Sequence, residues 1–243
     1  MVNVLTLAVN DLRNILRDKF LIFASILYPI MMITIARIIR HFIAPRVENM
    51  FPLVSNYPVL FMIFTIFIPI IFGFITAFLI MDEKDEHLLT VLRVMPISRN
   101  TYLIYRMLFM SIFSFIVLLI FPRLSGLLID TQFSYISYLP IAVLFCLFTP
   151  FIALLVTSFA QNKVQAFAIF KMSGTVFILP ILTFILHLDD IKYIFSPIPN
   201  FWTFMALDSV IKEGTLDVLP LGIGFVYHII LLALLFYIFN KKN

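Results

Sequence analysis

Residues 81–99 of the sequence read MDEKDEHLLTVLRVMPISR, the most densely charged segment of an otherwise apolar chain. At 100° per residue, the apolar side chains of this segment fall on one face of a helix and the charged and polar ones on the other. The apolar face holds Leu88, Val91, Leu92 and Met95, and the opposite face holds Glu83, Glu86, Thr90 and Arg93. Pro96 ends the helix, because proline has no N–H to donate and disfavours helical geometry at the preceding residue. The pattern predicts an amphipathic helix over residues 83–95.

Two interpretations of this charged helix follow from the residues. It is held at a membrane surface by an apolar stretch on either side, so it is well placed to receive force from a soluble partner. The alternative is a solvated loop between two spans, which is the commoner arrangement in membrane proteins. Residue chemistry alone leaves both open.

The composition of the chain excludes a soluble protein. Hydrophobic residues make up 63% of its 243 residues and charged residues 12%, and the mean hydropathy is +1.10. A soluble domain of this composition exposes large apolar patches and aggregates. The net charge of +4 therefore reflects how charge is distributed across a membrane and does not indicate a nucleic-acid partner. The single cysteine, Cys146, excludes a disulfide framework and a thiolate metal site.

Six apolar stretches are long enough to cross a bilayer, which takes about 20 residues in a helix. They predict an all-α integral membrane protein with one transmembrane domain over residues 1–243. The predicted spans are residues 20–42, 58–81, 102–121, 138–159, 166–186 and 219–239.

Two further helical segments are predicted outside these spans. Residues 2–18 carry apolar side chains at helical spacing with basic and amide side chains opposite, which predicts an amphipathic elbow helix at the membrane surface. A secretory signal does not fit, because no basic region precedes the apolar residues and no small-residue cleavage site follows. Residues 190–212, rich in apolar side chains and prolines, predict a re-entrant segment before the last span. A helix lying on the membrane surface is an equally good interpretation of residues 190–212.

The basic residues predict the orientation of the chain. With the N-terminus inside, 11 of the 17 Lys and Arg residues lie on the inner side, and the net charges are +5 inside and −1 outside. Basic residues are enriched in cytoplasmic loops, so both termini and the charged helix are predicted to be cytoplasmic.

Charged and titratable residues in the predicted spans have more than one interpretation. Arg37, Arg40 and His41 lie near the outer end of the first span, where they reach out to the headgroups or line a substrate path. Lys171 lies less than two turns into the fifth span. His228 in the last span is interpreted as a buried structural side chain or as a proton relay. No carboxylate lies deep in any span, which counts against a proton-coupled carrier.

Known catalytic and nucleotide-binding motifs are absent from the sequence. It lacks the G-x-x-x-x-G-K-[ST] phosphate loop, and its six glycines are scattered. H-E-x-x-H and G-x-S-x-G are absent too, and the four histidines share no metal-ligand spacing. The chain is therefore expected to be no enzyme and to hold no cofactor or metal of its own.

In the order of its segments and in its charged helix, the whole chain resembles the permease subunit of type-2 ABC exporters, small six-span bacterial drug or peptide exporters. In that family the first internal loop carries an acidic cluster, a leucine-rich helix and a Pro-[Ile/Val]-Ser turn, and a re-entrant segment precedes the sixth span. The matching residues here are Glu83, Glu86, Leu88-Leu89, Leu92 and Met95-Pro96-Ile97-Ser98. One departure is visible, because the family usually has Gly-Thr where this chain has His87-Leu88.

The resemblance implies that this helix is a coupling helix that contacts a separate ATPase subunit. The implied ATPase contacts are Asp82, Glu83, Asp85, Glu86 and Arg93. The implied seating residues, which hold the helix against the spans, are Leu88, Leu89, Leu92, Met95 and Pro96. ATP and Mg²⁺ would be bound by the ATPase partner.

The resemblance also implies an activity, a location and partners. An ATPase dimer would move the coupling helices of two permease copies, in a homodimer or a heterodimer, and a cavity at their interface would alternate between inward and outward access. The cargo would be an amphipathic or hydrophobic compound, such as an antimicrobial or toxin peptide or a drug, leaving through the bacterial plasma membrane. The 29 Phe and 11 Met residues offer soft walls to such cargo, although most of them must face lipid. The alternative is an ATPase-independent carrier or a membrane anchor of another complex.

Overall fold

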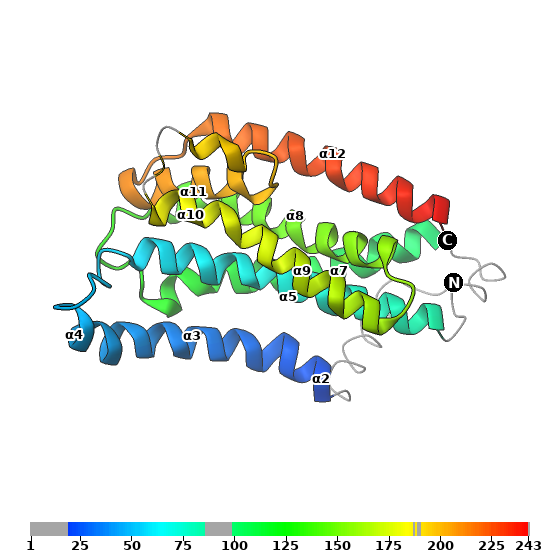
Figure 1. The fold of residues 1–243 in the computed structure, drawn as a ribbon, viewed down its shortest axis with the longest axis horizontal. Coiled ribbons are helices and arrows are strands. Elements are labelled where there is room, and N and C mark those ends of the chain that lie inside the picture. The colour runs from blue at the N-terminus through cyan, green and yellow to red at the C-terminus, as the bar shows by residue number, and fades with distance from the viewer. Residues whose placement is uncertain (1–18, 86–98, 187, 189–190, 243) are drawn as a thin grey trace.

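The computed structural model describes residues 19–85, 99–186, 188 and 191–242, and every regular element in this part of the chain is a helix (Figure 1). Six helical stretches are long and apolar enough to cross a membrane, so the predicted all-α fold with six spans is confirmed. These stretches are Ser25–Val47, Tyr57–Lys84, Asn100–Ser125, Tyr135–Phe159, Lys163–Ile185 and Val218–Lys242.

The centre of the bundle is the contact between α5 (Tyr57–Asp85) and α8 (Tyr135–Phe159). Their apolar stretches are buried over most of their length, and α7 (Arg99–Ser125) packs against both helices. Gly73 lets the two central backbones approach closely. A Cβ atom at this position would lie 2.6 Å from the carbonyl oxygen of Thr149 and 2.7 Å from the Cβ of Ile152.

The first span runs along the outside of the bundle and is irregular. Its α-helical part α3 (Tyr28–Ile38) packs on α7 and lies at the lower edge of Figure 1. Two π-helical turns interrupt the span, and such turns are rare outside functional or strained sites. The elements before and after α3 are α2 (Lys19–Ile22), η1 (Phe23–Leu27), η2 (Ile39–Ile43) and α4 (Ala44–Val47).

The fifth span begins directly after a tight turn and changes its pitch near its far end. The Asn162 side chain caps α9 (Lys163–Ile178) by accepting from the backbone N–H of Gln165 at 2.9 Å. Pro180 lies in the short 3₁₀ segment η4 (Leu179–Ile181), which leads into α10 (Leu182–Ile185). Proline cannot donate the hydrogen bond of a regular α-helix, which accounts for the break.

The segment before the last helix dips along the bundle and returns. It comprises η5 (Lys192–Phe195), a turn over residues 196–199, and α11 (Asn200–Glu213), which leads back to the start of α12 (Val218–Lys242).

The turn contacts the middle of two spanning helices. The Asn200 amide donates to the carbonyl of Phe177 in α9, and the Tyr227 hydroxyl of α12 donates to the carbonyl of Pro197 at 2.7 Å. The indole N–H of Trp202 donates to the carbonyl of Ser196 at 3.2 Å. These bonds satisfy backbone carbonyls that lipid cannot satisfy. A surface helix would contact only the ends of α9 and α12, so these contacts favour the predicted re-entrant segment, whose depth in the membrane stays a prediction.

The two ends of the bundle differ in their connections. At one end, on the right in Figure 1, lie the end of α5, the start of α7, the turn between α8 and α9, and the end of α12. At the other end lie the connections over residues 48–56, 126–134 and 186–217, the last of which holds η5 and α11. We call these the short-turn end and the long-loop end.

Candidate coupling site and permease family

The predicted coupling segment leaves the bundle at the short-turn end, between α5 and α7. α5 runs through Asp85, so residues 83–85 belong to the spanning helix. The other predicted contact and seating residues lie outside the residues that the structure describes, and their contacts stay predictions. These residues are Glu86, Leu88, Leu89, Leu92, Arg93, Met95 and Pro96.

The carboxylate of Glu83 is buried between α5 and α7. Its Oε1 atom accepts from the Tyr102 hydroxyl at 2.5 Å and forms an ion pair with the guanidinium of Arg106. The side chains of Glu83 and Arg106 are only 9% and 8% exposed. The guanidinium also lies 5.6 Å from the centre of the Tyr102 ring. Glu83 therefore joins α5 to α7 where these helices lead into the predicted coupling segment.

The neighbouring carboxylate, Asp82, points in another direction and joins α5 to α9. It forms an ion pair with the ammonium group of Lys163, the first residue of α9. Both side chains are close to half exposed, at 43% for Asp82 and 49% for Lys163. Successive residues on a helix point about 100° apart, which explains why two adjacent acids bind different helices. The ends of α5, α7 and α9 are thus connected by two ion pairs.

The partners of these acids are not evident from the sequence. Tyr102 and Lys163 are ordinary residues at helix ends, and only Arg106 carries a signal. It lies inside the predicted span 102–121, and a charged residue within a span usually has a buried partner. That partner, Glu83, lies on a different helix, so no local pattern identifies it.

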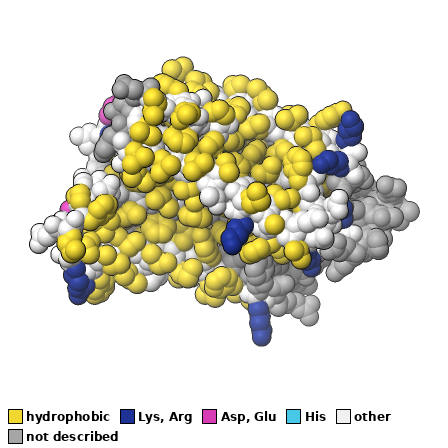
Figure 2. Space-filling model, viewed as in Figure 1, with side chains coloured by type: hydrophobic (Ala, Val, Ile, Leu, Met, Phe, Trp, Pro, Cys, Tyr) yellow, Lys and Arg dark blue, Asp and Glu magenta, His cyan; other side chains and the backbone are white. Residues whose placement is uncertain are grey.

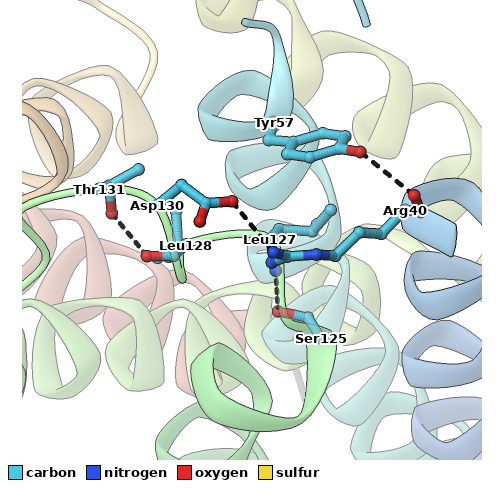
Figure 3. A network of polar contacts seen from close by, with 7 residues as sticks. All are labelled: Arg40, Tyr57, Ser125, Leu127, Leu128, Asp130 and Thr131. Atoms are coloured by element: carbon cyan, nitrogen blue, oxygen red, sulfur yellow. Dashed lines mark hydrogen bonds and ion pairs between the residues drawn. The ribbon is translucent and has the colours of Figure 1, made fainter. Parts of the chain in front are cut away.

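At the long-loop end, Arg40 of the first span contacts the connection after α7 (Figure 3), and Arg37 contacts the last turn of α7. Nη2 of Arg40 lies 3.0 Å from Oδ2 of Asp130, and Nε of Arg37 donates to the carbonyl of Leu124 at 2.6 Å. The end of α7 and the connection after it thus supply acceptors for both arginines, and their expected reach to the headgroups or to a substrate path stays a prediction. His41 is exposed.

His228 is buried, and its contacts are typical of a side chain that packs in a helix bundle. Its Nδ1–H donates to the carbonyl of Gly224 at 2.8 Å, and its ring lies edge-on to Phe148 with 5.9 Å between centres. Within the described ranges, no group of three His, Cys, Asp or Glu side chains is placed to hold a metal ion. These contacts favour the packing role over the proton relay.

A family model described as "Fluoroquinolones export permease protein Rv2686c-like" matches residues 11–236 of the chain. The chain belongs to this family of export permeases. Two relatives from Mycobacterium tuberculosis are 27% identical over 239 residues, covering 96% of the chain and 92% of each relative. They are the fluoroquinolones export permease proteins MT2760 (strain CDC 1551 / Oshkosh) and Rv2686c (strain ATCC 25618 / H37Rv). No solved structure matches the chain.

These matches confirm the resemblance to an ABC exporter permease that the sequence indicated. A member of the Rv2686c-like family with six spanning helices is a multi-pass membrane protein and a transport subunit. The residue pairs at the short-turn end thus belong to an export permease.

Proposed function

We propose that the chain is the permease subunit of an ATP-driven exporter of planar, amphipathic drugs of the fluoroquinolone class. The observation that carries this proposal is the match to Rv2686c-like export permeases over almost the whole chain. The relatives' names favour a drug over the peptides that the sequence left open. The high Phe and Met content of the chain predicts soft apolar walls along the transport path, which suit an aromatic cargo.

The short-turn end is proposed to face the cytoplasm of a bacterial cell, together with both termini. Six basic residues of the described ranges lie toward the long-loop end, namely Arg37, Arg40, Arg46, Arg123, Lys192 and Lys212. Ten of the other eleven lie at or near the short-turn end or in the sequence segments that adjoin it, and the eleventh, Lys171, lies about two turns from that end in α9. This asymmetry supports the orientation, because cytoplasmic loops are enriched in Lys and Arg.

A separate ATPase dimer is proposed to bind ATP and Mg²⁺ and to press on residues 86–98. Asp82, Asp85, Glu86 and Arg93 are the proposed contacts, and Glu83 acts as a positioning residue. The Glu83–Arg106 and Asp82–Lys163 pairs support this role, because they join the ends of α5, α7 and α9. A displacement of the coupling segment would therefore reach three spanning helices together.

Two permease copies are proposed to form the transport path between them. Only 17% of the apolar stretch of the first span and 22% of that of the fifth are buried within one chain. These surfaces leave room for lipid and for a second copy, and a closed two-fold dimer is the commonest assembly. Closure of the ATPase would then switch the path between inward and outward access.

The test is drug uptake into inside-out membrane vesicles that contain the chain and a co-expressed ATPase. Uptake of a fluoroquinolone should require ATP hydrolysis. Glu86→Lys or Arg93→Glu should lower this uptake and should also lower the amount of ATPase that purifies with the tagged permease. Glu213→Lys, an exposed charge reversal at the long-loop end, is the matched control and should keep both. Drug uptake in vesicles that lack any ATPase would indicate an ATPase-independent carrier. If the vesicles show no uptake and the chain purifies with another protein complex, it would be a membrane anchor. Either result overturns the proposal.

A further inference from the structure

Lys171 is an exposed charge about two turns into a spanning helix. It lies eight residues after Lys163, the start of α9, which places it about 12 Å along the helix axis at 1.5 Å per residue. Among the residues that the structure describes, no carboxylate forms an ion pair with it. The face of the molecule that carries α9 is largely hydrophobic, with isolated basic side chains (Figure 2).

Lipid is an unfavourable environment for a lysine at this depth. A charged side chain in the hydrocarbon region is costly, and such residues usually face the interior of a bundle, a partner or a water-filled cavity. Lys163 at the start of the same helix pairs with Asp82 at the short-turn end of the bundle. A lysine side chain spans only part of the distance from Lys171 back to that end. The Lys171 face of α9 is therefore expected to line an aqueous path or an interface.

Aromatic side chains cluster on the stretch of α9 that carries this lysine. Phe167, one turn before Lys171 on α9, is 53% exposed and lies on the same face. Phe170 stacks on Phe74 of α5 with 3.8 Å between ring centres, and the buried Phe74 meets Phe167 edge-on at 6.0 Å. Thr175, one turn after Lys171, is also exposed and adds a hydroxyl group. One cation thus shares this stretch of helix with an exposed phenyl ring that is backed by two others.

A second copy of the chain, related by a two-fold axis along the membrane normal, would bring none of the described carboxylates to Lys171. These carboxylates lie toward the two ends of the bundle, and the sequence has none deep in any span. Such an axis keeps every residue at its own depth, so a partner copy presents its acids at the ends as well. A cargo with an acid group can supply the anion that the described residues do not.

We propose that Lys171 binds the carboxylate of a planar aromatic cargo whose ring system lies against Phe167. This assignment rests on the proposed function and narrows it to aromatic compounds that carry an acid group. A charge-assisted hydrogen bond to an ammonium group is stronger than a neutral one. Rings prefer offset or edge-to-face contact with other rings, which the exposed ring of Phe167 offers.

The test compares a fluoroquinolone with its methyl ester, which keeps the ring system and lacks the anionic carboxylate. Equilibrium binding to the purified permease–ATPase complex in lipid nanodiscs avoids differences in passive permeation. The acid should bind roughly tenfold or more tightly than the ester, as expected for a hydrogen bond to a charged group. Lys171→Ala should remove this difference by weakening the acid alone, and Lys171→Arg should preserve it. Phe167→Leu should weaken both compounds.

The matched control is Lys241→Ala, at an exposed lysine near the end of α12, which should leave both affinities unchanged. Equal binding of acid and ester by the wild-type complex overturns the assignment of Lys171 and leaves the proposed function standing. If Lys171→Ala weakens the binding of acid and ester equally, the assignment of Lys171 is overturned as well, and the proposed function still stands. If the wild-type complex binds neither compound, the proposed cargo fails, and the role of Lys171 fails with it.

Discussion

The carboxylate of Glu83 and the guanidinium of Arg106 form a buried ion pair that joins α5 to α7 just before both helices enter the predicted coupling segment. The Tyr102 hydroxyl donates to the same carboxylate oxygen. Loss of one member of a buried pair leaves an uncompensated charge out of contact with water. The integrity of this end of the α5–α7 hairpin therefore depends on the pair.

Glu83→Leu or Arg106→Met should each destabilise the protein by about 3–5 kcal/mol, the usual cost of breaking a buried ion pair. The double substitution should cost less than the sum of the two single changes, because no charge is then left unpaired. Unfolding in mild detergent, followed by thermal and denaturant titration, measures these effects.

Asp82→Asn is the matched control for that experiment, because Asp82 also pairs with a basic residue but is 43% exposed. Exposed pairs contribute about 0–1 kcal/mol, so its effect on stability should be small. A cost for Asp82→Asn as large as that for Glu83→Leu would contradict the distinction between a buried pair and an exposed one.

Gly73→Ala should destabilise the protein by about 1–3 kcal/mol, the usual cost of overpacking a core. The added methyl group would meet the backbone carbonyl of Thr149 and the Cβ of Ile152, neither of which can easily give way. Gly222→Ala provides the comparison, since nothing lies within 4 Å of a Cβ atom at that position on α12. That change should be neutral or stabilising by up to about 1 kcal/mol through helix propensity. Equal melting temperatures for the two variants would argue against the close approach of α5 and α8.

The orientation of the chain can be tested with single cysteines, because Cys146 is the only native one. In a Cys146→Ala background, Ser55→Cys reports on the long-loop end and Gln161→Cys on the short-turn end; both native side chains are exposed. A membrane-impermeant maleimide added to intact cells should label the first variant and should label the second only after permeabilisation. The reverse pattern would place the predicted coupling segment outside the cell.

His228→Asn should retain most of the ATP-driven uptake and leave its pH dependence unchanged. The histidine ring packs between the Gly224 carbonyl and Phe148, so the expected loss is in stability. Uptake by the wild-type complex should also persist when a protonophore dissipates the proton gradient. Uptake that disappears with the gradient and with His228→Asn would instead identify a proton-coupled carrier.

The spans of this fold are predictable from the sequence because each depends on one local property, a run of apolar residues long enough to cross a bilayer. The charged segment was located in the same way, as an interruption between two such runs. For the segment that forms η5 and α11, a re-entrant path and a surface helix were equally good interpretations, because amino-acid composition does not specify depth.

Side-chain partners on different helices were not predictable. Asp82 and Glu83 have the same chemistry and adjacent positions, yet one pairs with α9 and the other with α7. Likewise, Arg37 binds the last turn of α7 and Arg40 binds the connection after it, 87 and 90 residues away in the sequence. A single sequence carries no record of such distant contacts. The packing of helices, which determines them, depends on the shapes of all six spans at once.

The unequal burial of the spans has a mechanical consequence. In α5, 67% of the residues of the apolar stretch are buried, against 17% in the first span and 22% in the fifth. Separating α5 from α8 would undo the densest packing of the subunit, whereas tilting either peripheral span breaks few contacts. A conformational change during a transport cycle should therefore cost the least free energy if the first and fifth spans move while the α5–α8 pair stays fixed.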